Sequence, residues 1–146
     1  MFQAVAWLAT LCSSLFSGAA LYITLVEHPA RMGLDTEIAA RQWALSYKRA
    51  TRMQAPLALL SFLAGVVAWI IGAGIGWLVA AVLIGAVVPF TIVAIMPTND
   101  RLLATDRDLG SAETRTLLEH WGTLHAVRTT LGLGATVMDL SLLALS

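Results

Sequence analysis

Charged residues are missing from long stretches of this 146-residue sequence. Residues 1–26 and 53–99 contain no Asp, Glu, Lys or Arg, and Asp139 is the one charged residue after Arg128. The chain is 58% hydrophobic and has a mean hydropathy of +0.79, which is too apolar for an ordinary soluble domain. We therefore expect an integral membrane protein, with a soluble protein of unusually apolar helices as the alternative.

Other features that the sequence lacks narrow the class further. The net charge is zero, so the composition gives no indication of a nucleic-acid partner. The single cysteine, Cys12, excludes an intramolecular disulfide. The alternating pattern of a membrane barrel strand is absent. Residues 17–20 resemble a signal-peptide cleavage site, but no Lys or Arg precedes them, so we expect residues 1–26 to be a membrane span.

The apolar stretches have the length of membrane-spanning helices. A hydrocarbon core ~30 Å thick requires about 20 helical residues, and a helix satisfies its own backbone polar groups in lipid. The sequence predicts spans at about 2–27, 54–73, 76–97 and 122–145. The expected fold class is all-α: an integral membrane four-helix bundle forming a single domain over residues 1–146, with short amphipathic helices in its two charged connections.

The basic residues predict how the bundle is oriented. All nine Lys and Arg residues lie within 31–52 and 101–128, in or beside the first and third connections. The positive-inside rule places these connections in the cytoplasm and both termini outside, and we expect a bacterial inner membrane. Lipid is thus the first expected partner.

The two connections carry local helix signals. Asp35 and Thr36 favour the start of a helix whose face of residues 39, 43, 47 and 50 suits the membrane surface. Ser111 favours the start of a helix that continues into the last span. Pro89, four residues after Gly85, predicts a kink in the third span.

Polar residues gather where the connections meet the spans, at 27–29, 97–101 and 120–128. Trp121, His125 and Arg128 share a helix face that continues through small residues at 132 and 135, so this face should point into the bundle. An arginine at this depth needs a partner, for which we expect Glu27 or Asp100. The alternative is that these residues are interface anchors.

Asp139 lies near the far end of the last predicted span. We expect it to be a solvated end residue.

The polar cluster allows three kinds of chemistry. Histidine and carboxylate side chains could ligate a transition metal such as iron or copper, with His28, His125 and Glu27 as the ligands. The histidines could act as acid and base. The cluster could also simply hydrogen-bond across the bundle. His120 and His125 are five residues apart, which points them in different directions and leaves no metal-binding spacing within the last span.

The same polar segments resemble the anthrone oxygenase-like family, a group of small four-helix membrane proteins long described as a domain of unknown function. The similarity rests on residues 18–22 (GAALY), 26–29 (VEHP), 97–102 (PTNDRL) and 121–128 (WGTLHAVR), in the expected order over essentially the whole chain. Some members of this family oxidise an anthrone to an anthraquinone with molecular oxygen and are described without a cofactor.

The resemblance implies a membrane-embedded oxidoreductase, an oxygenase acting on an apolar aromatic or quinone-like small molecule. It implies no cofactor, and no nucleic acid is expected; a homo-oligomer stays open. The alternative is a non-catalytic small membrane subunit or a lipophilic-ligand-binding protein, and a carrier or channel is disfavoured because no inverted repeat is seen. Carried over by position, the candidate catalytic residues are His28, His125, Arg128, Asn99, Glu27 and Asp100.

Overall fold

The computed structural model describes residues 1–145, whose regular secondary structure is entirely helical. This confirms the all-α prediction. The elements are α1 (Phe2–Tyr22), the π-helical segment η1 (Ile23–Glu27), α2 (His28–Met32), α3 (Thr36–Ile70), α4 (Ile75–Gly85), α5 (Val87–Phe90), a second π-helical segment η2 (Thr91–Ile95), α6 (Met96–Leu103) and α7 (Ala112–Ala144).

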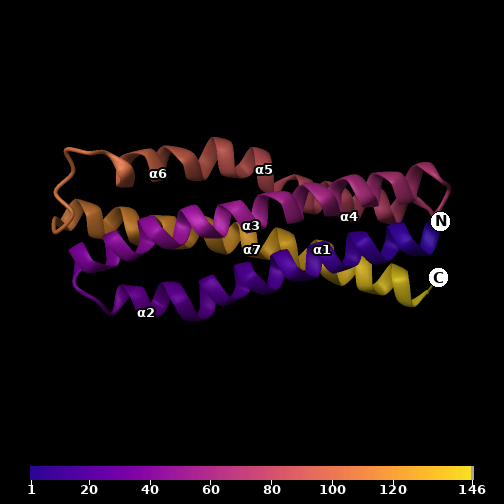
Figure 1. Cartoon of the computed structure of the whole chain (residues 1–146), viewed down its shortest axis with the longest axis horizontal. Coiled ribbons are helices and arrows are strands. Elements are labelled where there is room, and N and C mark those ends of the chain that lie inside the picture. The colour runs from indigo at the N-terminus through magenta and orange to yellow at the C-terminus, as the bar shows by residue number, and fades with distance from the viewer. Residues whose placement is uncertain (146) are drawn as a thin grey trace.

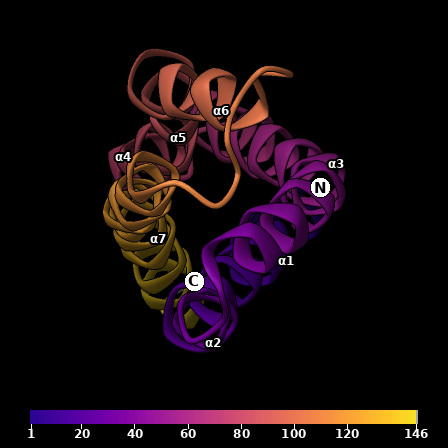
Figure 2. The ribbon, with the colours of Figure 1, turned by 90° about the vertical axis from the view of Figure 1, so that its left-hand side faces the viewer.

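These elements form four long rods that lie side by side (Figures 1 and 2). The rod of α1, η1 and α2 packs on α3 and α7, and α4 packs on the same two helices from the other side. Both termini and the α3–α4 turn lie at one end of the molecule, and the two charged connections lie at the other (Figure 1). Gly72 and Gly74 adopt positive φ angles of 91° and 102°, which lets the α3–α4 turn reverse the chain within a few residues.

Small side chains occupy most buried positions of two long helices, and many large apolar side chains lie on the outside. The buried positions of α1 and α3 are mostly Ala, Ser and Gly, and a Cβ on Gly65 would lie 2.9 Å from the Cβ of Ala81 on α4. Leu11, Leu63 and Val93 are among many large residues exposed on the surface. Close approach of helix backbones and an apolar exterior are typical of helices packed in lipid.

Three helices are long and apolar enough to cross a membrane by length and composition: Phe2–Met32, Thr36–Ile70 and Ile75–Leu103. The apolar helices indicate insertion into a bilayer. The fourth rod, α7, does not meet this criterion, yet it runs the length of the bundle beside the others (Figure 1). Three of its polar residues along the apolar stretch, His125, Arg128 and Asp139, are buried inside the bundle.

The helix of the first connection is not a separate surface element. Residues 36–52 form the first half of the 35-residue helix α3, which continues without a break into the apolar stretch. The expected membrane-facing positions turn inward instead: Ala39 and Trp43 are 0% and 1% exposed. The face is apolar because it packs against other helices.

The other local predictions have mixed outcomes. Ser111 is the N-cap of α7, where its hydroxyl accepts a hydrogen bond of 3.1 Å from the Thr114 amide, as predicted.

The third rod is interrupted between Gly85 and Val87, where Pro89 can give no amide hydrogen to the Gly85 carbonyl. The prediction for Asp139 is wrong: it is 2% exposed and accepts a hydrogen bond of 2.7 Å from Ser13, because α1 covers this part of α7.

Candidate functional site

Trp121 of α7 is the centre of an aromatic and cationic cluster near the charged end of the bundle. The His125 ring stacks on it at 4.8 Å between centroids, and the His28 ring lies 5.3 Å from it. Trp43 of α3 meets it edge-on at 5.9 Å, and the Arg31 guanidinium lies over it at 5.8 Å. We call these five residues the Trp121 cluster; they come from α2, α3 and α7.

Arg31 ties the cluster to α3. Although 2% exposed, it donates hydrogen bonds to Glu27 at 2.6 Å and to Nδ1 of His28 at 3.1 Å. It also donates to Gln42 and Ser46. A guanidinium has no acceptor, so Nδ1 of His28 must be the accepting atom and neutral His28 carries its proton on Nε2.

His125 has a different set of partners. It is 3% exposed, and its Nδ1 lies 3.1 Å from the Thr24 hydroxyl in η1. The Thr24 hydroxyl in turn lies 2.8 Å from that of Thr129. Of the two histidines, only His125 lines the adjoining cavity.

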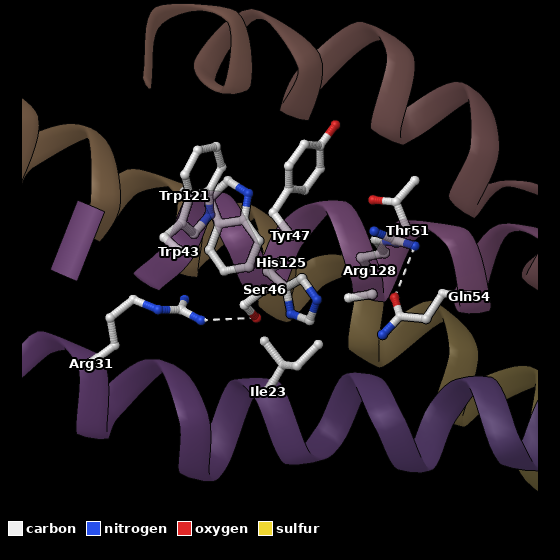
Figure 3. A pocket seen from close by; sticks show the side chains of 11 residues that line it. Ile23, Arg31, Trp43, Ser46, Tyr47, Thr51, Gln54, Trp121, His125 and Arg128 are labelled. Atoms are coloured by element: carbon white, nitrogen blue, oxygen red, sulfur yellow. Dashed lines mark hydrogen bonds between the residues drawn. The ribbon is translucent and has the colours of Figure 1, made fainter. Parts of the chain in front are cut away.

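A small cavity lies against the cluster (Figure 3). It leaves about 10 Å³ for the centre of a water-sized sphere, the room of roughly one water molecule. The side chains labelled around it in Figure 3 come from the first rod, α3 and α7. The cavity is therefore lined by the same three parts of the chain that contribute the Trp121 cluster: the first rod, α3 and α7.

Several buried donors beside this cavity are unsatisfied. Within residues 1–145, four nitrogen atoms of cavity-lining residues have no hydrogen-bond partner, and we call them the unpaired donors: Trp43 Nε1, Gln54 Nε2, Trp121 Nε1 and Arg128 Nε. Buried polar atoms are nearly always paired, so this concentration needs an explanation. Donors without acceptors suit an oxygen atom that carries negative charge.

The expected ion pair of Arg128 is wrong. Arg128 donates to the neutral Oε1 of Gln54 at 3.1 Å, and its guanidinium lies 5.3 Å over the Phe16 ring. Glu27 is engaged by Arg31, and Asp100 is exposed. Arg128 therefore contacts an amide and an aromatic ring, and neither neutralises its charge. Its guanidinium is available to bind an anion.

The structure brings together only part of the residue set predicted from the sequence. His28, His125 and Arg128 lie in or beside the Trp121 cluster, and Glu27 bounds it through Arg31. Asn99 is 1% exposed but does not line the cavity, and its side-chain amide has no partner within the described chain.

A metal centre gains no support from the geometry. No group of three or more His, Cys, Asp or Glu side chains that could hold a metal ion occurs in the part of the chain that the structure describes. Of the expected ligands, Glu27 accepts hydrogen bonds from Arg31, Gln42 and Ser46, and Nδ1 of His28 faces Arg31.

Sequence reasoning missed the residues that α3 contributes. Trp43, Tyr47, Ala50 and Gln54 line the cavity from one face of α3. Their spacing of three to four residues was the available signal, because it continues unchanged from the charged connection into the apolar span. The spacing of four residues between Glu27 and Arg31 was the signal for the ion pair that these two residues form.

Comparison with known proteins finds relatives of this sequence. The sequence model of the family described as anthrone oxygenase matches residues 43–138, which include the cavity residues of α3 and α7. The anthrone oxygenase ptaC of Pestalotiopsis fici is 34% identical over 128 residues, covering 75% of this chain and 87% of the relative. The anthrone oxygenase tpcL of Aspergillus fumigatus is 31% identical over 144 residues, covering 90% and 88%. No solved structure matches the chain.

Proposed function

This chain belongs to the anthrone oxygenase family, and on that premise we propose that it is a membrane-embedded oxygenase that oxidises an anthrone-like aromatic molecule with O2. In this reaction a ring methylene becomes a carbonyl. The methylene loses two hydrogens and gains one oxygen atom, and the second oxygen atom leaves as water with those two hydrogens. The observation that carries the proposal is the set of unpaired donors beside His125.

His125 is the proposed base. It removes a proton from the methylene carbon, and the electron pair moves onto the carbonyl oxygen of the substrate. Arg128 and the other unpaired donors stabilise this oxyanion, since fixed donors act strongly where water is excluded. The electron-rich carbon then bonds to O2. Removal of the second proton and departure of the outer oxygen, protonated to water, complete the carbonyl.

The substrate is proposed to reach the site from the bilayer. A groove of about 410 Å³ between the first rod and α3 shares Ile23, Ser46, Ala50 and Gln54 with the wall of the cavity. We propose that the flat apolar rings lie in this groove while one oxygen occupies the cavity, which requires the shared side chain of Ile23 to move. No cofactor is assigned to the reaction, and assembly into a homo-oligomer is left to size measurements in detergent.

The orientation is also part of the proposal. The charged connections face the cytoplasm and both termini face outside, on the positive-inside rule. A bacterial inner membrane was the expectation from sequence; the two relatives are fungal and do not support it.

The small cavity favours a second candidate, a non-catalytic membrane subunit. Trp121 fills the space between His28 and His125, as a side chain that only holds helices together would. In a non-catalytic subunit, the Trp121 cluster would stabilise the bundle and catalyse no reaction.

Oxygen uptake by detergent-solubilised protein separates the two candidates. With an anthrone, the wild type should consume one O2 per molecule oxidised, and His125→Ala and Arg128→Ala should each lower turnover by roughly a hundredfold or more. His120→Ala is the matched control, because His120 is exposed on the same helix. Both active-site variants should unfold close to the wild-type temperature. Variants that unfold together with their loss of activity, or a wild type that consumes no oxygen, would overturn the oxygenase proposal.

A further inference from the structure

A chain of hydrogen-bonding groups runs from His125 back to the helix backbone. Nδ1 of His125 is 3.1 Å from the Thr24 hydroxyl, which is 2.8 Å from the Thr129 hydroxyl. The Thr129 hydroxyl is 3.1 Å from the carbonyl oxygen of His125 and 3.3 Å from that of Ala20. The chain therefore ends on two groups that can only accept.

The direction of this chain follows from the number of protons in it. If Thr129 donates to a carbonyl, Thr24 donates to Thr129, and the free lone pair of Thr24 accepts from His125 Nδ1–H. All three links are then made. If the direction is reversed, Thr24 donates to Nδ1 and Thr129 donates to Thr24, so no proton is left for the carbonyls. The first arrangement makes one hydrogen bond more, which favours it.

We infer that Thr24 and Thr129 hold His125 in the tautomer with its proton on Nδ1, so that Nε2 presents a free lone pair as the base. The catalytic role of this tautomer rests on the proposed function, since a base must have an unprotonated nitrogen. The unpaired donors beside the cavity agree with it, because a lone pair suits a donor-rich wall and an N–H group does not. Thr24 is thus a positioning residue that acts through His125.

The π-helical turn is what puts Thr24 in place. Thr24 lies in η1, where the His28 amide bonds to the Ile23 carbonyl five residues back. Such segments insert one residue into a helix and are frequent at functional sites. His28, one residue beyond η1, has the opposite tautomer because Arg31 donates to its Nδ1. The two histidines on either side of Trp121 are therefore assigned different roles.

Nitrogen NMR of histidine-labelled protein in detergent tests the tautomer without substrate. The signals of His125, assigned by their loss in His125→Gln, should show a protonated Nδ1 and an unprotonated Nε2. Thr24→Val keeps the shape of the side chain and removes the acceptor, so it should shift this pattern toward protonated Nε2. Thr24→Ser should restore the wild-type pattern. Thr130→Val is the control, because Thr130 is exposed and donates only to Ala126 of its own helix.

Kinetics provide a second readout. Thr24→Val should lower kcat by roughly tenfold or more with little change in KM, because a base in the wrong tautomer is disabled, and Thr24→Ser should recover most of it. A protonated Nε2 in the wild type, or a pattern that Thr24→Val leaves unchanged, would overturn the inference even if oxygen is consumed. The predicted NMR pattern together with no oxygen uptake would support the tautomer assignment and overturn the proposed function instead.

Discussion

Gly122 leaves the space against α7 that the His28 ring occupies. A Cβ at this position would lie 2.6 Å from Cδ2 of His28, so one of the two would have to move. The ring has little freedom, because Trp121 lies beside it and Arg31 holds its Nδ1. A glycine within a long helix is here a packing requirement of the site.

We predict that Gly122→Ala lowers stability, although alanine favours helix. Overpacking costs about 1–3 kcal/mol, and at so short a distance we expect this cost to exceed the roughly 1 kcal/mol gained in helix propensity. Gly134→Ala is the control on the same helix, since its Cβ would meet Leu83 at an ordinary 3.7 Å. Thermal unfolding in detergent should show a lower midpoint for Gly122→Ala and an equal or higher one for Gly134→Ala. The reverse order would contradict the packing described for His28.

Single residues also show what sequence could and could not predict about the site. The shared face of Trp121, His125 and Arg128 was predictable, because helical periodicity alone decides it. The partner of Arg128 was not. Expectation favoured a carboxylate, but Gln54 takes this place because α3 continues straight into the bundle and brings its amide beside α7.

Among the helical elements, the two π-helical segments could not be predicted from the sequence. The sequences of η1 and η2 are rich in β-branched residues, like many other turns of a membrane helix, although η1 ends in Glu27. Helix lengths and caps follow from local chemistry, as at Ser111, but an inserted residue depends on what the neighbouring helices offer on either side. The separate surface helix predicted for the first connection failed for a similar reason, because its apolar face found helices to pack against.

Deleting Leu25 tests what η1 positions. The π-helical turn accommodates one extra residue, so removing one residue should restore an α-helical turn and leave the rest of the rod facing as before. Glu27, His28 and Arg31 should then stay beside Trp121 and Ser46, while Thr24 inside the turn shifts relative to His125, so oxygen consumption should fall about as much as in Thr24→Val. Leu25→Ala is the control, because this side chain is 64% exposed and packs little. Full activity after the deletion would show that the π-helical turn is not needed.

At the scale of the whole molecule, helix length leads us to expect the site at the membrane boundary. The 33 residues of α7 span about 50 Å, longer than a hydrocarbon core of about 30 Å. The end of α7 that holds the Trp121 cluster therefore emerges toward the charged connections (Figure 1). Composition was enough to predict the four rods, because segregated charge and apolar length are properties of the whole chain.

Cysteine labelling tests the orientation that this arrangement requires. In a Cys12→Ala background, Ile75→Cys lies at the turn beside the termini and Asp106→Cys lies in the second charged connection, and both positions are exposed. A membrane-impermeant reagent added to intact cells should label Ile75→Cys and reach Asp106→Cys only after the membrane is opened. The physical reason is that basic side chains are retained on the cytoplasmic side. Labelling of both positions from the same side would contradict the spanning arrangement, and labelling in the opposite order would leave the bundle intact and reverse its orientation.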